Sequence, residues 1–350
     1  MNKVAYITGI TGQDGSYLAE HLLSQGYQVY GMVRRMSLMN TERIDHLQGK
    51  IKLLYGDVTD AQSIASALNT IVADQPTPLD TTLEVYHLAA QSHVRISFDM
   101  PDYTTNVDAI GTLKLLQECH RLQQSDKVHA IKVYIAATSE LYGNAYQFPQ
   151  SEITPFNPCS PYSISKLYAF HIAKMYREGY NMFVAIGILF NHESPRRTAN
   201  FVTRKITTSL GKILRGEQET IEMGNLDAVR DWGHAKDYVR AMHLMLQHPT
   251  PETFVIATRE AHTVREFIEE AFKLRNLTIT WKGPRGTLQE TGVDQHGITR
   301  ITINPKYYRP IDVRALKGDP SKANRLLGWC PGTSFQELVR EMVDHDAANP

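Results

Sequence analysis

The apolar positions in the first half of the chain fall into short continuous runs, separated by longer amphipathic segments. The runs are rich in β-branched and aromatic residues, which is typical of strands that are buried on both faces. The segments between them repeat apolar residues every three or four positions, which predicts helices. The predicted strands cover 3–8, 27–33, 51–55, 83–88, 131–137 and 182–189, and the predicted helices cover 16–25, 61–74, 106–123 and 160–179.

This alternation of strands and helices predicts an α/β fold. Because strand–helix–strand crossovers are right-handed, helices should cover both faces of a doubly wound parallel sheet of the Rossmann type. The second half is less regular and ends in a predicted helix over 334–346. We expect a dinucleotide-binding domain over 1–190, to which 226–260 returns, and a smaller α/β C-terminal substrate domain built from 191–225 and 261–350.

The composition restricts the classes of partner. Lys plus Arg and Asp plus Glu number 37 each, so no net charge would recruit nucleic acid or an anionic membrane. Polar residues interrupt the apolar runs, which predicts no membrane span, and the N-terminus lacks the layout of a signal peptide. Cys119, Cys159 and Cys330 are too widely spaced for a disulfide framework or a metal-ligand pattern. We expect a cytoplasmic protein that holds no metal.

A glycine motif stands between the first predicted strand and the first predicted helix. Gly9, Gly12 and Gly15 form Gly-x-x-Gly-x-x-Gly. The first glycine permits a tight turn, the second lets the backbone approach a pyrophosphate, and the third lets the helix pack closely. The helix N-terminus would then face the phosphates. A plain strand-to-helix turn is the alternative, but the context favours a dinucleotide site.

The residues after the second predicted strand bear on the choice between NAD and NADP. An NAD site usually has a carboxylate there for the ribose 2′-hydroxyl, whereas this chain has Arg34 and Arg35. Guanidinium groups suit a 2′-phosphate, so we expect NADP; a solvated basic loop is the alternative. Asp57, after the third strand, is placed to bond the adenine. The other cofactor contacts that we expect lie in or near these loops: Ile10, Thr11, Gln13, Asp14, Val58, Leu88, Ala89, Ala90, Gln91, Ser92 and Tyr103.

Four polar residues follow the fifth predicted strand or begin the next helix. Thr138 and Glu140 lie beyond the carboxyl end of that strand, where open α/β sheets bind ligands. Tyr162 and Lys166 are one helical turn apart on one face. Tyrosine has a reference pKa of about 10, and a nearby lysine cation favours the phenolate, as would the positive charge of the nicotinamide. The group therefore predicts proton removal from an alcohol during hydride transfer to NADP; two solvated residues on a helix face are the alternative.

The glycine motif, Thr138 and the pair Tyr162–Lys166 together resemble the extended short-chain dehydrogenase/reductases that act on nucleotide sugars. Glu140 narrows the resemblance to the sugar-nucleotide 4,6-dehydratases, because epimerases and simple reductases usually lack this glutamate. Blocks such as TSELYG (138–143), GILFNHESPRR (187–197) and GDPSKANRLLGW (318–329) are similar to the members of that family that act on GDP-mannose. The similarity runs from residue 3 to about residue 345, and it implies GDP-mannose as the substrate.

The resemblance implies a reaction in which the cofactor is regenerated in each turnover. The family oxidises C4 of the mannosyl ring, a carboxylate removes the acidified C5 proton, the C6 hydroxyl leaves as water, and the hydride returns to C6. Glu140 would be that carboxylate, with capping of the following turn as its alternative role. The resemblance also implies cofactor contacts by His192 and Arg197, and GDP-sugar contacts by Ser92, Glu140, Asn191, Lys205, Arg230, Arg309 and Asp312.

The resemblance also bears on assembly and on competing functions. The family's basic loop reaches a neighbouring subunit, which implies a homodimer or homotetramer, although Met36 here replaces a serine. A 4-epimerase or 4-keto-sugar reductase would have no role for Glu140, and reduction of the enzyme's own 4-keto product stays open as a secondary activity. A non-catalytic NADP(H)-binding regulator would not need all four polar residues. We therefore expect a hydro-lyase on the route to GDP-fucose or other GDP-deoxyhexoses.

Overall fold

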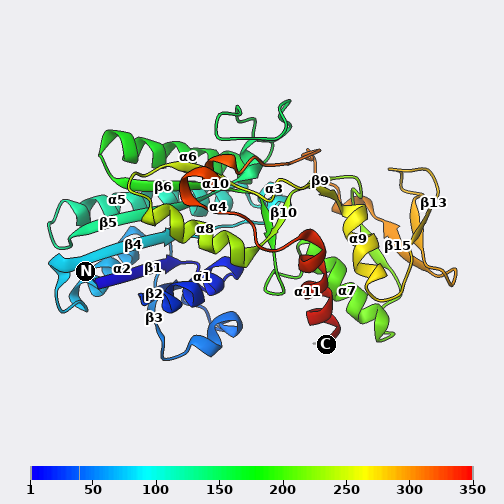
Figure 1. The fold of residues 1–350 in the computed structure, drawn as a ribbon, viewed down its shortest axis with the longest axis horizontal. Coiled ribbons are helices and arrows are strands. Elements are labelled where there is room, and N and C mark those ends of the chain that lie inside the picture. The colour runs from blue at the N-terminus through cyan, green and yellow to red at the C-terminus, as the bar shows by residue number, and fades with distance from the viewer. Residues whose placement is uncertain (1, 39, 349–350) are drawn as a thin grey trace.

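A seven-stranded parallel sheet forms the centre of the larger lobe of the molecule (Figure 1). The computed structural model describes residues 2–38 and 40–348. The strand order is β11-β6-β5-β4-β1-β2-β3, and every neighbouring pair is parallel. The order reverses between β1 and β4, the kind of position where open α/β sheets bind ligands. The strands are β1 Asn2–Thr8, β2 Gln28–Val33, β3 Ile51–Tyr55, β4 Thr81–His87, β5 Ala130–Thr138, β6 Phe183–Leu189 and β11 Thr253–Ile256.

Helices cover both faces of this sheet, so the predicted doubly wound α/β fold is confirmed. Apolar residues on one side of each helix pack onto the sheet, because burying that stripe is what stabilises an amphipathic helix. The helices on one face are α1 Gln13–Ser24 and α8 Ala235–Gln247, and those on the other are α2 Ala61–Ala73, α5 Gly111–Gln123 and α6 Pro161–Gly179. Within the described ranges, no helix is both long and apolar enough to cross a bilayer.

One predicted helix differs from its sequence pattern. The apolar spacing predicts a continuous helix over 106–123, but residues Asn106–Ile110 form a π-helical turn (η3) before α5 begins at Gly111. Two short helices precede this turn, α3 Val94–Asp99 and α4 Pro101–Thr105. Turns of this kind occur often at functional sites, and this one lies directly beside α6.

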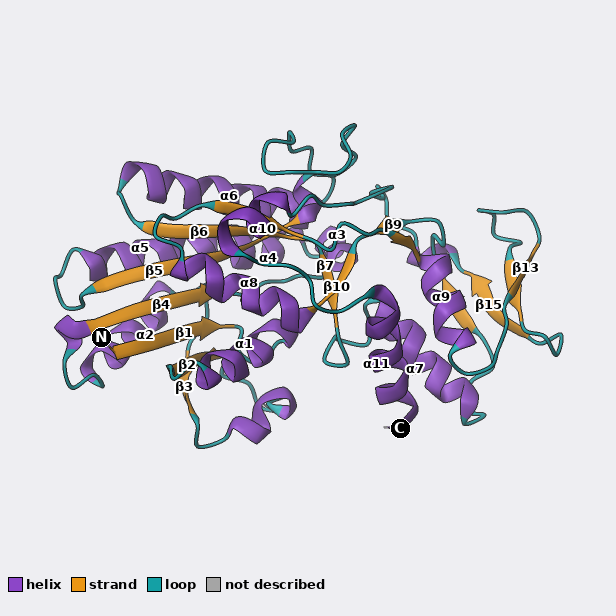
Figure 2. Cartoon of the chain, in the orientation of Figure 1, coloured by secondary structure: helices purple, strands orange, loops and turns teal. Residues whose placement is uncertain are grey.

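A smaller α/β layer stands beside the carboxyl ends of the main strands, on the right in Figure 2. Its sheet has the order β13-β14-β15-β8, in which only the β15–β8 pair is parallel. Three helices pack with it around a separate apolar core that includes Leu210, Phe267 and Leu338. The elements are α7 Val202–Leu214, β8 Ile221–Met223, α9 Val264–Lys273, β13 Thr280–Lys282, β14 Thr291–Val293, β15 Thr299–Ile303 and α11 Phe335–Ala348.

Two short ladders join the two layers. Strand β7 (Asn191–Glu193) pairs with β10 (Trp232–His234), and β9 (Val229–Arg230) pairs with β12 (His262–Thr263). Residues 313–329, which the sequence assigns to the substrate domain, instead pack on the main sheet through Val313, Leu316 and Trp329, around helix α10 (Ser321–Leu327). The two-domain division itself stays a prediction, with this segment moved to the sheet side.

Candidate active site

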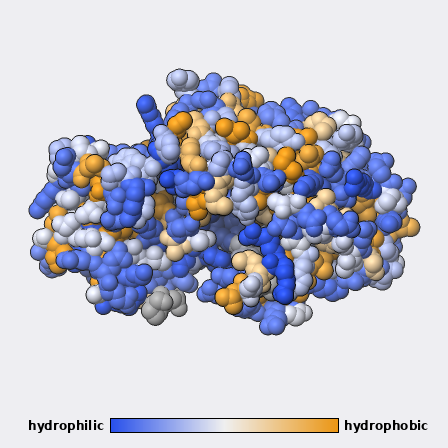
Figure 3. Space-filling view, turned by 180° about the vertical axis from the view of Figure 1, so that it is seen from behind, coloured by the Kyte–Doolittle hydropathy of each residue, from blue (hydrophilic) through white to orange (hydrophobic). Residues whose placement is uncertain are grey.

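A cleft of about 1170 Å³ runs between the carboxyl ends of the main strands and the smaller layer. Figure 3 shows the surface hollowed between the two lobes. Glycine-loop residues line one end of the cleft, and Arg230, Arg309 and Asp312 line the other. Most of the predicted cofactor residues and all of the predicted substrate residues therefore line one continuous space, large enough for a dinucleotide and a nucleotide sugar together.

The glycine loop forms the turn that the motif predicts. Gly9 has φ +76, and a Cβ there would lie 2.9 Å from the backbone nitrogen of Ala89. At Gly15 a Cβ would lie 2.3 Å from the carbonyl oxygen of Gly9, so the helix can approach the strand only without a side chain. Gly12 is the N-cap of α1 and supplies no side-chain cap. The amide groups at the start of α1 are thus available to an anion in the cleft.

Most of the residues that are predicted to contact the adenosine part of a cofactor line the cleft. Arg34 lines the cleft, and its Nη1 donates to the hydroxyl of Tyr103 at 2.9 Å. Asp57 also lines the cleft, but its Oδ1 already accepts from the amide and the hydroxyl of Thr59. A ligand bond from Asp57 would therefore use its other oxygen. The remaining predicted cofactor residues in the cleft wall are Thr11, Gln13, Asp14, Val58, Leu88, Ala89, Ala90 and Ser92.

Three predicted cofactor residues do not line the cleft. Ile10 is fully buried in the apolar cluster beneath α1. Arg35 points outward and lies over the ring of Tyr55, 5.8 Å from the guanidinium carbon to the centroid. The side chain of Gln91 holds its own loop, donating to Thr104 and accepting from the amide of His93. These three follow the cleft-lining residues in sequence, but their side chains point elsewhere.

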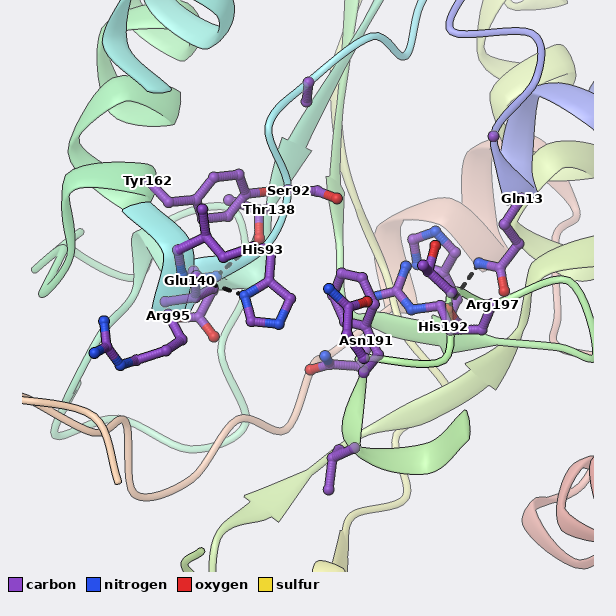
Figure 4. A pocket seen from close by; sticks show the side chains of 18 of the residues that line it. Gln13, Ser92, His93, Arg95, Thr138, Glu140, Tyr162, Asn191, His192 and Arg197 are labelled. Atoms are coloured by element: carbon purple, nitrogen blue, oxygen red, sulfur yellow. Dashed lines mark hydrogen bonds between the residues drawn. The ribbon is translucent and has the colours of Figure 1, made fainter. Parts of the chain in front are cut away.

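The four predicted catalytic residues all line the cleft, and Figure 4 shows three of them, Thr138, Glu140 and Tyr162, together at one side of it. Thr138 ends β5, and its Oγ1 accepts from the amide of Glu140 at 3.2 Å, which starts the short turn η4 (Ser139–Leu141). Tyr162 and Lys166 project from the first turns of α6, which Ser160 caps through a capping box. Lys166 donates to the carbonyl of Ala136 at 2.9 Å. This hydrogen bond connects the first turns of α6 to the end of β5.

Burial and neighbouring groups act in opposite directions on the acidity of Tyr162. Burial raises the pKa of its phenol, and the charge of Asp108 raises it further, while a hydrogen bond from Thr138 opposes the shift. Burial also lowers the pKa of Lys166. Desolvation therefore works against the phenolate that the sequence predicts. That Lys166 and the charge of a nicotinamide together favour the phenolate stays a prediction.

Arginines surround the other end of the cleft. Glu140 is 8% exposed, and its Oε1 lies 3.4 Å from Nη1 of Arg309. Arg230 is buried, is held by the carbonyls of Val229 and Val313, and lies 3.4 Å from Oδ1 of Asp312. Lys205 lies over the ring of Tyr307, with 3.3 Å between its nitrogen and the centroid. Backbone carbonyls thus hold Arg230 and a ring contact holds Lys205, while Arg309 is held by carboxylates; fixed cations of this kind can bind an anionic ligand.

Asn191 and His192 face the cleft from the strand β7 side (Figure 4). Oδ1 of Asn191 is buried and has no hydrogen-bond partner among the described residues, so a ligand can use it. His192 donates from Nδ1 to the carbonyl of Phe190 and from Nε2 to Asp14 at 2.7 Å. Burial would lower the pKa of His192, but the Asp14 carboxylate raises it above its ordinary value. Arg197 stacks on the ring of Phe201 at 3.6 Å and lines the same wall.

The structure also brings residues to the site that the sequence did not single out. Arg95 and Asn225 line the cleft, and Asp108 lies behind Lys166. His93 also lines the cleft, and it caps the start of α3, where its Nδ1 accepts from the amide of Ile96. Among the described residues, no three His, Cys, Asp or Glu side chains are grouped to hold a metal ion. Arg95 and Asn225 belong to no motif, so only the tertiary structure identifies them.

The sheet, the glycine loop and the Thr–Tyr–Lys group define an extended short-chain dehydrogenase/reductase. Its added carboxylate, Glu140, stands beside the tyrosine at the strand end. A family model described as GDP-mannose 4,6 dehydratase matches residues 6–342, and the chain belongs to this family. The GDP-mannose 4,6 dehydratase of Drosophila melanogaster is 53% identical over 99% of this chain and 86% of its own length. That of Homo sapiens is 52% identical over 98% of this chain and 91% of its own.

Solved structures show the same fold at lower sequence identity. The UDP-glucose 4-epimerase of Thermus thermophilus, in complex with NAD, superposes with a TM-score of 0.78 at 24% identity, covering 99% of this chain and 100% of the other. The dTDP-glucose 4,6-dehydratase DesIV of Streptomyces venezuelae, with NAD bound, gives a TM-score of 0.79 at 23% identity, covering 99% and 97%. At this level of identity the agreement concerns the fold.

Proposed function

We propose that this chain converts GDP-D-mannose to GDP-4-dehydro-6-deoxy-D-mannose by loss of one water. The observation that carries the proposal is the presence of Glu140 and Tyr162 on one wall of a single cleft, which supplies two separate acid–base groups. Oxidation of an alcohol needs only the tyrosine as its acid–base group, and an epimerase or a reductase would need no second one. Elimination of water needs a second base, and Glu140 is placed to be that base.

The residues of the chain divide the proton transfers between them. Tyr162 takes the proton of the sugar C4 hydroxyl, while Thr138 accepts or donates a hydrogen bond to the same oxygen. Glu140 removes the proton from C5 and returns a proton to C5 after elimination, and the proton taken from the C4 hydroxyl balances the one with which the C6 hydroxyl leaves as water. Arg230 and Arg309 hold the diphosphate, and the buried oxygen of Asn191 is available to the sugar. The net change is the loss of one water.

A nicotinamide dinucleotide fits the other end of the cleft. Gly15 lets α1 approach β1, the uncapped helix start accepts a pyrophosphate, and His192 and Arg197 complete a cationic wall. A nicotinamide bound there would supply the acceptor for the hydride of C4 and its donor for C6, and its positive charge would favour the phenolate of Tyr162. We propose NADP rather than NAD, because Arg34 occupies the cleft wall where an NAD site has a carboxylate.

Replacing Arg34 with Ala should weaken binding of NADP about 10- to 100-fold and leave binding of NAD almost unchanged, because one charged hydrogen bond is worth about 1.5–3 kcal/mol. Calorimetric titration of cofactor-stripped protein with each dinucleotide measures both constants. Arg35→Ala serves as the control, since that side chain lies outside the cleft wall and should change either affinity little. An equal loss for NADP and NAD would contradict the assignment of Arg34.

The proposed reaction is tested by incubating the full chain with GDP-mannose and NADP and analysing products by mass spectrometry. We expect a product that is lighter by one water, with no net accumulation of reduced cofactor. A product of unchanged mass would indicate an epimerase, and a bound cofactor without turnover of any GDP-sugar would indicate a regulator. Either outcome overturns the proposal.

Assembly, location and place in metabolism also remain proposals. We propose a homodimer or homotetramer, supported by the exposed apolar residues Ile164, Tyr168 and Met175, which recur along one side of α6. The free cysteines Cys119, Cys159 and Cys330 are consistent with a reducing, cytoplasmic setting. The 4-keto product would supply the synthesis of GDP-fucose or another GDP-deoxyhexose.

A further inference from the structure

The π-helical turn η3 holds a buried carboxylate, Asp108, directly beneath the catalytic helix. Asp108 is 1% exposed and does not line the cleft. Its Oδ1 accepts from the amide of Gln91 at 2.7 Å, whereas its Oδ2 has no hydrogen-bond partner among the described residues. A carboxylate that is buried with one oxygen unpaired is costly, so its presence at this point calls for a local reason.

The charged groups around Asp108 are those of the active site. On α6, Lys166 and Tyr162 both interact electrostatically with Asp108. On the side of β4, His87 bonds Thr112, whose hydroxyl donates to the backbone carbonyl of Asp108. His87 is neutral there, because burial lowers its pKa to about 3. The positive charge that faces the carboxylate from these elements is therefore that of Lys166.

Burial and the charge of Asp108 both act on the pKa values of Lys166 and Tyr162. Burial lowers the pKa of Lys166, and the negative charge of Asp108 opposes that shift and so favours the ammonium form. Burial is the largest cause that raises the pKa of Tyr162, and the negative charge of Asp108 is the second. Asp108 itself has its pKa raised by burial to about 6, with Lys166 and the Gln91 amide opposing the shift. At neutral pH the carboxylate is therefore ionised and acts on both residues.

We propose that Asp108 is a positioning residue for catalysis: its buried charge is the counter-ion of Lys166 and sets the pH range in which the Tyr162–Lys166 pair works. This inference rests on the acid–base role proposed for Tyr162 and Lys166. Asp108 touches neither the cleft nor a reacting atom, so it acts only through these two side chains. A negative charge stabilises the protonated form of each neighbour.

Removing the charge should shift both limbs of the pH profile in the same direction. Without Asp108 the pKa of Tyr162 falls, so the acid limb moves to lower pH. The pKa of Lys166 falls as well, so the alkaline limb, where the ammonium is lost, also moves to lower pH. We expect a shift of about one pH unit, given the size of Coulomb interactions at an effective dielectric constant of about 20. Below about pH 6 the wild-type carboxylate is itself protonated, so the profiles should converge there.

The test measures kcat and kcat/KM for GDP-mannose as functions of pH, using the full chain with its bound cofactor. Asp108→Asn is the principal variant, because its amide oxygen can still accept from Gln91 while the charge is gone. Asp108→Ser, smaller and equally uncharged, gives the same information if the asparagine variant does not fold. Asp102→Asn is the matched control, since this exposed aspartate lies in the neighbouring helix α4. The KM of Asp108→Asn at its own optimum should stay within about twofold.

The outcomes separate this inference from the proposed function. A downward shift of both limbs in Asp108→Asn, absent in Asp102→Asn, supports the counter-ion role. A lower rate without a shift means that Asp108 only braces the loop at Gln91 and overturns the proposal, as does an upward shift or an equal shift in the control. If the wild type does not dehydrate GDP-mannose, the proposed function is wrong. The role inferred for Asp108, which rests on that function, is then overturned with it.

Discussion

The substitution Glu140→Gln is expected to stop the loss of water, lowering the rate of product formation about 10³- to 10⁴-fold. The amide has the size of the carboxylate but cannot take the C5 proton, and general-base catalysis of this kind contributes about 10²- to 10⁴-fold. The salt bridge from Arg309 is also lost, but that cation stays in the cleft for the diphosphate. Binding of GDP-mannose should therefore change much less than turnover.

Two measurements distinguish loss of the base from general damage. Single-turnover products of Glu140→Gln should carry a 4-keto group and an intact C6 hydroxyl, because Tyr162 still accepts the C4 proton. In D₂O the wild type should incorporate deuterium at C5, and the variant should not. Glu140→Asp, with a shorter carboxylate, should retain part of the activity. Full dehydration by Glu140→Gln would place the C5 base on another residue.

The substitution Tyr162→Phe is expected to block the reaction one step earlier. The phenyl ring fills the same buried space, so folding should be preserved, while the only atom removed is the oxygen that takes the C4 proton. We expect kcat to fall about 10³-fold or more with KM for GDP-mannose nearly unchanged, the pattern of an interaction made in the transition state.

The products of Tyr162→Phe should differ from those of Glu140→Gln. No 4-keto sugar should form in a single turnover, and no deuterium should enter C5, because acidification of that position depends on the ketone. Tyr180→Phe is the control: this tyrosine caps the end of the same helix, is 47% exposed, and should leave turnover close to that of the wild type. Accumulation of the 4-keto sugar in Tyr162→Phe would remove the tyrosine from the oxidation step.

The main sheet could be predicted from sequence because its signals are local. Each buried strand is a short apolar run and each covering helix has a three-to-four-residue repeat, so six strands and their order of occurrence follow directly. The seventh strand, β11, has only four residues and pairs at the sheet edge, far in sequence from its neighbour β6. The turn at 106–110 escapes prediction because a π-helical turn has no distinct apolar spacing.

The residues of the candidate site also differ in whether local sequence could predict them. Thr138, Glu140, Tyr162 and Lys166 stand at the end of one strand and the start of the next helix, so their proximity could be deduced from the chain itself. Arg230 comes to the site through residue pairing between distant segments, which spacing cannot reveal. Side-chain direction is also a tertiary property, and three of the predicted cofactor contacts, such as Ile10, therefore point away from the cleft.

The path of the chain determines whether either lobe could be produced as a separate fragment. After β6 the chain passes to α7, returns with α8 and β11, leaves again with α9, returns with α10, and ends in the smaller layer with α11. Each lobe is thus assembled from non-contiguous pieces, and no single cut yields a fragment that retains a complete core. The several connecting strands also act as parallel tethers, which limit how far the lobes can swing apart. Release of a bound nucleotide sugar should therefore depend on local side-chain and loop motion rather than on wide opening of the two lobes.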